Sequence, residues 1–149
     1  MNIQQIEKID AVGFLVRTTN ENEQDQSTSK ISPLWKKFFT EALPQLTPES
    51  KVFGVYTNYE TDHTGAFDVI ACTDCMFKES PADLVDIQIE AGKYLTFSKK
   101  GPMPQAVIEL WGEVWMYFNI GECEHKRRFT TDFEFYRGID EVEISIAIE

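Results

Sequence analysis

Ile9-Asp10-Ala11-Val12-Gly13-Phe14-Leu15 recurs in similar form 80 residues later, as Ile89-Glu90-Ala91-Gly92-Lys93-Tyr94-Leu95. Both stretches alternate apolar and polar side chains, the pattern of a β-strand with one buried face. Internal similarity of this kind is the strongest guide to a fold that is built from repeated units. The sequence therefore predicts a single domain, residues 1–149, that contains two copies of one unit, residues 1–80 and 81–149.

A helical pattern follows each of these strands. In the first copy, Ser32 is placed as the N-cap and Pro33 lies in the first turn. The apolar stripe of this helix is formed by Trp35, Phe38, Phe39, Ala42 and Leu43. In the second copy, Pro104 precedes a stripe formed by Val107, Leu110, Trp111, Val114, Trp115 and Phe118. Each copy is therefore expected to carry one amphipathic helix.

Two further strand candidates follow each helix. Residues 51–53 correspond to 127–129, and residues 67–72 correspond to 142–147. The turns between them, at 62–65 and 137–140, contain the glycine that a tight connection favours. Each copy thus reads strand, helix, strand, strand. The predicted fold is an α+β domain with an antiparallel sheet, a pseudo-two-fold axis and a ligand groove between the halves.

Composition limits the classes of partner. The chain has 149 residues, with 14 Lys and Arg against 25 Asp and Glu, a net charge of −11. This charge disfavours direct binding to nucleic acid and favours a cationic ligand, although an acidic surface can also serve solubility alone. The sequence has no apolar run of membrane-spanning length and no signal peptide. With three cysteines, too few for a disulfide scaffold, the protein is predicted to be cytoplasmic.

Five short segments carry a resemblance to a known family. They are residues 31–38, 55–60, 89–94, 131–136 and 141–146, and their order and spacing span the whole chain. Together they resemble the bacterial gyrase-inhibitor-like effector-binding domain, which also occurs fused to DNA-binding domains in AraC-type and MerR-type regulators. The resemblance implies a free-standing member with a tandem strand-helix-strand-strand fold. It also implies an aromatic pocket for amphipathic, often cationic, small molecules.

Glu143 is the predicted anion of this pocket. The segment 141–149 alternates strictly, with Val142, Ile144 and Ile146 on one face and Glu143 on the other, beside small side chains. A cation that leaves water needs a fixed anion to offset its lost hydration. The family resemblance implies that an acidic residue of the last strand has this role. The alternative is a solvated strand face, and Asp68 at the equivalent position of the first copy is a weaker second candidate.

Aromatic side chains are the predicted lining of the pocket. Aromatic rings attract cations by about 0.5 to 2 kcal/mol each and stack on planar ligands. Core packing is the competing interpretation of each ring. The aromatic residues that we predict to bind the ligand are Trp35, Tyr56, Trp111, Trp115 and Tyr136.

The sequence contains no phosphate-binding glycine loop, dinucleotide fingerprint or hydrolase motif, so no cofactor and no catalytic residue are predicted. Cys72 and Cys75 form a C-x-x-C pair that Cys123 and His125 could complete as a zinc site. The spacing of the second pair is too tight for a structural site, so we predict no metal. His63 is expected to be a turn residue.

The predicted function is therefore capture of an amphipathic cation, either to sequester it or to report it to a partner. Two alternatives remain open at this point. One is a hydrolase of reactive xenobiotics with Glu143 as its general base. The other is a protein-interaction module that acts on a regulator or a topoisomerase through the acidic segment 21–25. The chain could work as a monomer or as a homodimer.

Overall fold

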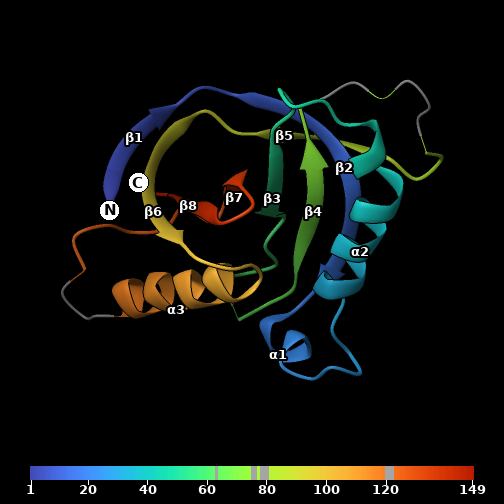
Figure 1. The fold of residues 1–149 in the computed structure, drawn as a ribbon. Coiled ribbons are helices and arrows are strands. Elements are labelled where there is room, and N and C mark those ends of the chain that lie inside the picture. Colours follow the sequence, from blue (N-terminus) through green and yellow to red (C-terminus); the bar gives the residue numbers. More distant parts are fainter. Residues whose placement is uncertain (63, 75–76, 78–80, 120–122) are drawn as a thin grey trace.

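The described residues form one curled antiparallel sheet with helices packed against it (Figure 1). The computed structural model describes residues 1–62, 64–74, 77, 81–119 and 123–149. The first half of the chain contains β1 (Asn2–Ile6), β2 (Ile9–Thr18), α1 (Asn20–Glu23), α2 (Ile31–Glu41), a short 3-10 turn (Leu43–Gln45), β3 (Val52–Thr57) and β4 (Phe67–Thr73). The second half contains β5 (Val85–Ile89), β6 (Gly92–Lys100), α3 (Gln105–Asn119), β7 (Thr131–Gly138) and β8 (Glu141–Ala147).

The eight strands lie in the order β1-β6-β8-β7-β3-β4-β2-β5. Strands β1 to β4 of the first half correspond in order to β5 to β8 of the second half. If each strand is replaced by its counterpart, the result is the same order read in reverse. The two halves meet at the centre of the sheet, where β3 pairs with β7 and places Gly54 opposite Glu134 and Tyr56 opposite Asp132. Directly opposite residues on paired strands share a face of the sheet. The central pairing therefore brings side chains from both halves onto one surface.

Both faces of the sheet are covered. On one face, α2 buries Leu34 and Phe38 against β2, β3 and β4, and α3 buries Leu110 and Val114 against β6 and β8. The opposite face of the curled sheet carries a separate core, with side chains from strands of both halves. Its fully buried members include Val55, Ile70, Cys72, Ile89 and Tyr94. Alternate residues of the central strands thus enter different cores, one of which lies beneath the helices.

The structure extends and corrects several expected elements. Each half begins with an additional short strand, β1 or β5, which the repeat did not indicate. Residues 127–129 were predicted as a strand, but β7 begins at Thr131 and only an isolated bridge joins Arg127 to Ile148. Strands β4 and β8 lie where the repeat placed them. In the part of the chain that the structure describes, no helix has the length and apolar character needed to cross a membrane.

Helix α2 begins two residues earlier than expected, because its N-cap is Lys30 and not Ser32. The side chain of Lys30 forms no capping hydrogen bond. Instead, the carboxylate of Glu23 in α1 accepts hydrogen bonds from the backbone N–H groups of Lys30 at 2.9 Å and Ile31 at 3.1 Å. A carboxylate at this end satisfies free N–H groups and faces the positive end of the helix dipole. Glu23 therefore fixes the start of α2.

Candidate functional site

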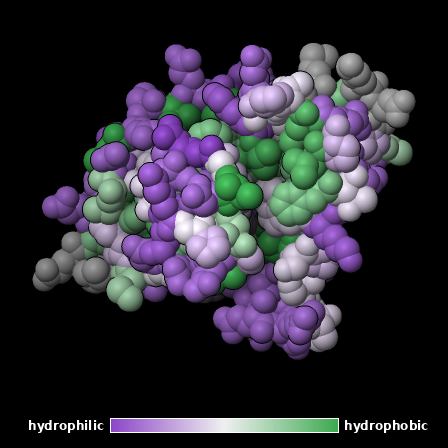
Figure 2. All heavy atoms as spheres, viewed as in Figure 1, coloured by the Kyte–Doolittle hydropathy of each residue, from purple (hydrophilic) through white to green (hydrophobic). Residues whose placement is uncertain are grey.

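A cavity of about 1070 Å³ lies between α2 and α3, above β3 and β7. Its volume is slightly above the roughly 300 to 1,000 Å³ that is typical of small-molecule sites. On the face shown in Figure 2, hydrophobic side chains gather around a hollow between the two helix-bearing sides, whereas much of the surrounding surface is hydrophilic. Several of the apolar residues at this cavity are exposed: Phe39, Leu43, Ile108, Trp115 and Ile139. The cavity is therefore open to an apolar guest.

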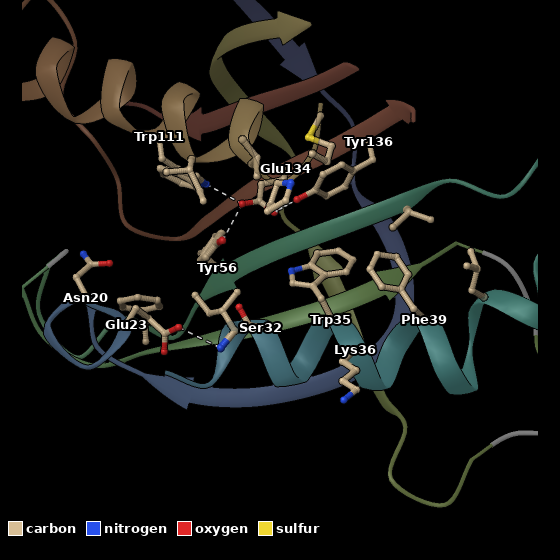
Figure 3. Close-up of a pocket in the computed structure, with 18 of the residues that line it drawn as sticks. Asn20, Glu23, Ser32, Trp35, Lys36, Phe39, Tyr56, Trp111, Glu134 and Tyr136 are labelled. Carbon is tan, nitrogen blue, oxygen red and sulfur yellow. Dashed lines mark hydrogen bonds between the residues drawn. The ribbon is translucent and has the colours of Figure 1, made fainter. Parts of the chain in front are cut away.

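Glu134 of β7 supplies a carboxylate at the wall of this cavity, and it is only 3% exposed. Its Oε2 atom accepts hydrogen bonds from Tyr56 Oη at 2.8 Å and Trp111 Nε1 at 2.7 Å. Its Oε1 atom accepts a hydrogen bond from Tyr136 Oη at 2.8 Å. Figure 3 shows these three side chains converging on Glu134, with Trp35 on the α2 side. Aromatic donors from three elements therefore hold one carboxylate in place.

None of the described residues forms a salt bridge with Glu134. Burial raises the pKa of Glu134 above its ordinary value of 4.5, and the hydrogen bonds from Trp111, Tyr136 and Tyr56 act in the opposite direction. Burial and the nearby carboxylate also raise the pKa values of Tyr56 and Tyr136, so both phenols stay protonated and able to donate. The carboxylate of Glu134 is thus hydrogen-bonded but has no counter-charge from any residue in the described ranges.

Gly54 makes the room that Glu134 occupies. The two residues lie opposite each other on β3 and β7. A Cβ atom at position 54 would come within 2.5 Å of Glu134 Oε1 and 3.0 Å of the Trp35 ring. Any larger residue at position 54 would therefore displace either the carboxylate or the ring that covers it.

The aromatic rings predicted from the sequence meet in this cavity. Tyr56 and Trp111 contact edge to face at a centroid distance of 5.0 Å, and Trp35 and Tyr136 do so at 5.3 Å. Trp111 also lies 6.2 Å from Trp115. All five border the cavity, so the structure brings together side chains from α2, β3, α3 and β7. These geometries are typical of stabilising aromatic pairs and leave ring surface available to a guest.

The expected position of the inward carboxylate needs correction. Glu143 is not among the described residues that line the cavity, and its Oε2 atom lies 3.4 Å from Arg137 Nε. It faces Phe135 across the β7–β8 pair, on the side of the sheet away from the helices. Ile144, which the alternation places on the face away from Glu143, is opposite Glu134 on the helix side. The alternation in β8 was correct, but the cavity lies on the other face.

Asp68, the weaker second candidate, also lies outside the cavity lining. Its Oδ1 atom forms an ion pair with Arg17 Nη1 at 3.0 Å, and its Oδ2 atom accepts a hydrogen bond from Asn58 at 2.7 Å. These contacts join β2, β4 and the segment after β3. The carboxylate of Asp68 is therefore occupied by structural partners.

Sequence reasoning missed Glu134, although residues 131–136 had been quoted as a motif. A signal was present, because Glu134 alternates with Phe133 and Phe135 and precedes Tyr136 on its own face. A glutamate between apolar residues of a strand is either exposed to solvent or buried with hydrogen-bond or charge partners. Only the location of the helices distinguishes these two outcomes.

The cysteine and histidine alternative gains no structural support. Cys75 and His63 lie outside the described residues. Cys72 is buried, where burial raises the pKa of its thiol, and it contacts the backbone oxygen of Phe53. Across the described ranges, no group of three or more His, Cys, Asp and Glu side chains could hold a metal ion.

Comparisons with known proteins agree with this architecture. The family model described as Cass2, integron-associated effector binding protein, matches residues 2–148. The crystal structure of an integron cassette protein from the mobile metagenome of Vibrio cholerae is 53% identical, with a TM-score of 0.94 over 99% of this chain and 95% of that chain. YobU, described as a candidate transcriptional regulator from Bacillus subtilis strain 168, is 28% identical over 83% of this chain and 78% of its own length.

A more distant structure shares the fold. SAV2435, solved with tetraphenylphosphonium bound, is 19% identical, with a TM-score of 0.72 over 99% of this chain and 93% of that chain. The family match over nearly the whole chain and the 53% identity to the Vibrio cholerae protein are decisive. The chain belongs to the Cass2 family of integron-associated effector binding proteins and is an effector-binding module.

Proposed function

We propose that the effector is an amphipathic aromatic cation and that Glu134 meets its positive charge. The observation that carries this proposal is a buried carboxylate held by neutral donors, without a cationic partner among the described residues, at the wall of a large aromatic cavity. A buried anion that lacks a counter-ion carries a desolvation cost, which a cationic guest offsets. The tetraphenylphosphonium bound by SAV2435 belongs to the same chemical class.

The rings supply the remaining affinity in this proposal. Trp35, Tyr56, Trp111, Trp115 and Tyr136 border the cavity and offer faces on which a planar or propeller-shaped cation can rest. Each such contact contributes about 0.5 to 2 kcal/mol, depending on desolvation. Apolar burial then sets the overall affinity, while Glu134 selects for positive charge. Binding of this type suits either sequestration of the cation or its detection.

We further infer that the two halves are duplicated units related by a pseudo-two-fold axis, with the groove at their junction. The reversed strand order after exchange of the halves supports this relationship. Tyr56 comes from the first half, whereas Trp111 and Glu134 come from the second. The axis would then pass near the β3–β7 pair, where the carboxylate lies.

Binding is favoured over the two alternatives. As a hydrolytic base, Glu143 would have to act from outside the cavity, where it is paired with Arg137. The acidic segment 21–25 is a poor polyanion mimic, because Glu23 is used at the start of α2 and Asp25 accepts hydrogen bonds from Ser27. Among the residues that the structure describes, the features predicted for the hydrolase and protein-interaction functions are therefore engaged in structural contacts.

The test is titration with tetraphenylphosphonium, followed by tryptophan fluorescence and by calorimetry. Saturable binding is expected, and Glu134→Gln should weaken it at least about tenfold, equivalent to about 1.4 kcal/mol. Glu143→Gln is the matched control, because it makes the same chemical change outside the cavity, and it should leave the affinity within about twofold. Unchanged affinity in Glu134→Gln, or an absence of saturable binding, would overturn the proposal.

A further inference from the structure

Arg127 provides a second polar group at the cavity. Its side chain is only 8% exposed, yet it is among the lining residues. The guanidinium packs 4.4 Å from the centre of the Phe129 ring, and the ring of Tyr59 lies 6.0 Å away. A buried arginine is stable only if its charge is balanced and its N–H groups find hydrogen-bond acceptors.

The charge of Arg127 is already balanced within the protein. Its Nη2 atom donates to Asp132 Oδ2 at 2.6 Å, and Asp132 is completely buried. The same carboxylate accepts a hydrogen bond from Tyr59 Oη at 2.5 Å and one from the Ala147 backbone N–H at 2.9 Å. The pair is therefore electrically neutral. Further negative charge near Arg127 would gain little from it.

One donor of Arg127 remains unused. Its Nε atom is buried and is the one side-chain polar atom among the described residues that is both buried and without a hydrogen-bond partner. A buried N–H group that has no acceptor costs free energy, and a bound partner at such a group removes that cost. Since Arg127 borders the cavity, an acceptor on a guest is a candidate partner for this donor.

The guanidinium lies close to the proposed cation site. Asp132 and Glu134 are two residues apart on β7, which separates their Cα atoms by about 7 Å. Asp132 is also opposite Tyr56, one of the donors to Glu134. A single drug-sized molecule can therefore reach both Glu134 and Arg127.

We propose that the ligand carries, in addition to its cation, a neutral hydrogen-bond acceptor such as an ester or ketone carbonyl, which docks on Arg127. This inference rests on the proposed function, because it places the ligand in the same cavity. A neutral acceptor fits better than a carboxylate, since Asp132 already balances the guanidinium. The carboxylates of Glu23 and Glu134 both border the cavity and would repel a carboxylate on the ligand.

Three dyes that share one xanthylium cation test this inference on the unaltered chain. Tetramethylrosamine has an unsubstituted pendant phenyl ring, tetramethylrhodamine methyl ester adds an ester to that ring, and tetramethylrhodamine adds a carboxylate. The ester should bind about tenfold more tightly than the rosamine, as expected for one hydrogen bond to a charged donor. The carboxylate dye should bind more weakly than the ester.

The outcomes separate this inference from the proposed function. Equal affinity of the ester and the rosamine overturns the acceptor site but leaves cation binding intact. Tighter binding of the carboxylate dye than of the ester overturns the requirement for neutrality. If none of the dyes binds saturably, the proposed function fails and the acceptor site fails with it.

A paired substitution distinguishes recognition from structural support. Arg127→Met together with Asp132→Asn removes both charges, keeps the apolar stem of residue 127 and preserves an acceptor for the Ala147 N–H. In this variant the affinity ratio of ester to rosamine should fall to about one, whereas a purely structural role would weaken both dyes equally and preserve the ratio. Glu134→Gln is the complementary control, since it should weaken every dye and keep the ratio. If the paired variant does not fold, the dye series on the unaltered chain decides the question.

Discussion

At the scale of single residues, position on a strand separates two glutamates of the same type. Glu134 and Glu143 both lie near the centre of the sheet, on paired strands. Glu134 points to the helix side and accepts hydrogen bonds from three aromatic side chains, while Glu143 points to the other side and pairs with Arg137. Because side chains alternate along a strand, a shift of one residue decides whether a carboxylate faces the cavity or the other side of the sheet.

The pKa of Glu134 leads to a pH-dependent affinity. Burial raises this pKa above 4.5, so protonation begins at a higher pH than for an ordinary glutamate, and only the ionised form attracts a cation. Affinity for tetraphenylphosphonium should therefore decrease as the pH is lowered through this range. Calorimetric titrations at a series of pH values would measure this change in affinity. Glu143→Gln should keep the pH dependence and Glu134→Gln should remove it, and a flat profile in the unaltered chain would contradict the assignment.

The same pKa has a consequence for stability without ligand. The folded state holds the proton of Glu134 more tightly than the unfolded state does. The contribution of Glu134 to the free energy of unfolding therefore declines as the pH rises from its ordinary value to the raised one. Once the carboxylate of Glu134 ionises, the protein carries the cost of a buried charge, which binding of a cation reduces.

At the scale of elements, helix α2 depends on a residue outside itself. Glu23 lies seven residues before Lys30 and eight before Ile31, yet it accepts the N–H groups of both. It also accepts hydrogen bonds from Thr18 Oγ1 at 2.6 Å and Ser29 Oγ at 3.0 Å. Burial alone would raise the pKa of Glu23, but these hydrogen bonds together lower it. The carboxylate thus joins the end of β2, α1 and the start of α2, beside the cavity.

Loss of this cap should be measurable. We expect Glu23→Ala to lower the free energy of unfolding by about 0.5 to 2 kcal/mol, the usual range for an N-cap. Denaturant unfolding followed by circular dichroism would test this value. Glu21→Ala, in the same short helix but at an exposed side chain, is the matched control and should change stability by less than about 0.5 kcal/mol. Equal effects of the two substitutions would contradict the capping role.

The Glu23 cap should also depend on pH with a defined sign. Because the pKa of Glu23 is lowered in the fold, its contribution is complete above its ordinary value. The contribution is lost as the pH falls through the lowered value. The stability difference between the unaltered chain and Glu23→Ala should therefore narrow in acid.

At the scale of the whole molecule, the site exists only where the halves join. Strand β3 of the first half pairs with β7 of the second, and this pairing places Tyr56 and Gly54 beside Glu134. The core on the opposite face likewise draws on strands from both halves, including Val55 and Ile70 from one and Tyr94 and Phe133 from the other. Each half thus has its own core beneath its helix, but neither half contains the complete core of the opposite face or the complete site.

Separate halves are therefore expected not to fold. Fragments 1–80 and 81–149 would each expose one central strand edge and half of the shared core, and chains of this size bury too little surface to tolerate that loss. Thermal unfolding followed by circular dichroism should show a cooperative transition for the full chain and none for either fragment. A sigmoidal transition in an isolated fragment would contradict the prediction.

The sequence by itself predicted the α+β class, the amphipathic helices and the strands at 67–72 and 142–147. It also predicted the aromatic residues that border the cavity. These features depend on local periodicity and on similarity between nearby segments, which a linear chain displays directly. The short strands β1 and β5 escaped prediction because Asn2–Ile6 and Val85–Ile89 gain their structure from pairing with β6 and β2.

Tertiary structure alone decided which carboxylate faces the cavity. Alternation along a strand places Glu134 and Phe135 on opposite faces of the sheet, and does the same for Glu143 and Ile144. It does not indicate which of the two faces the helices cover. That choice arises from the packing of α2 and α3 and from the β3–β7 pairing. The buried carboxylate of Glu134 and the unused donor of Arg127 are likewise properties of contacts between residues distant in sequence.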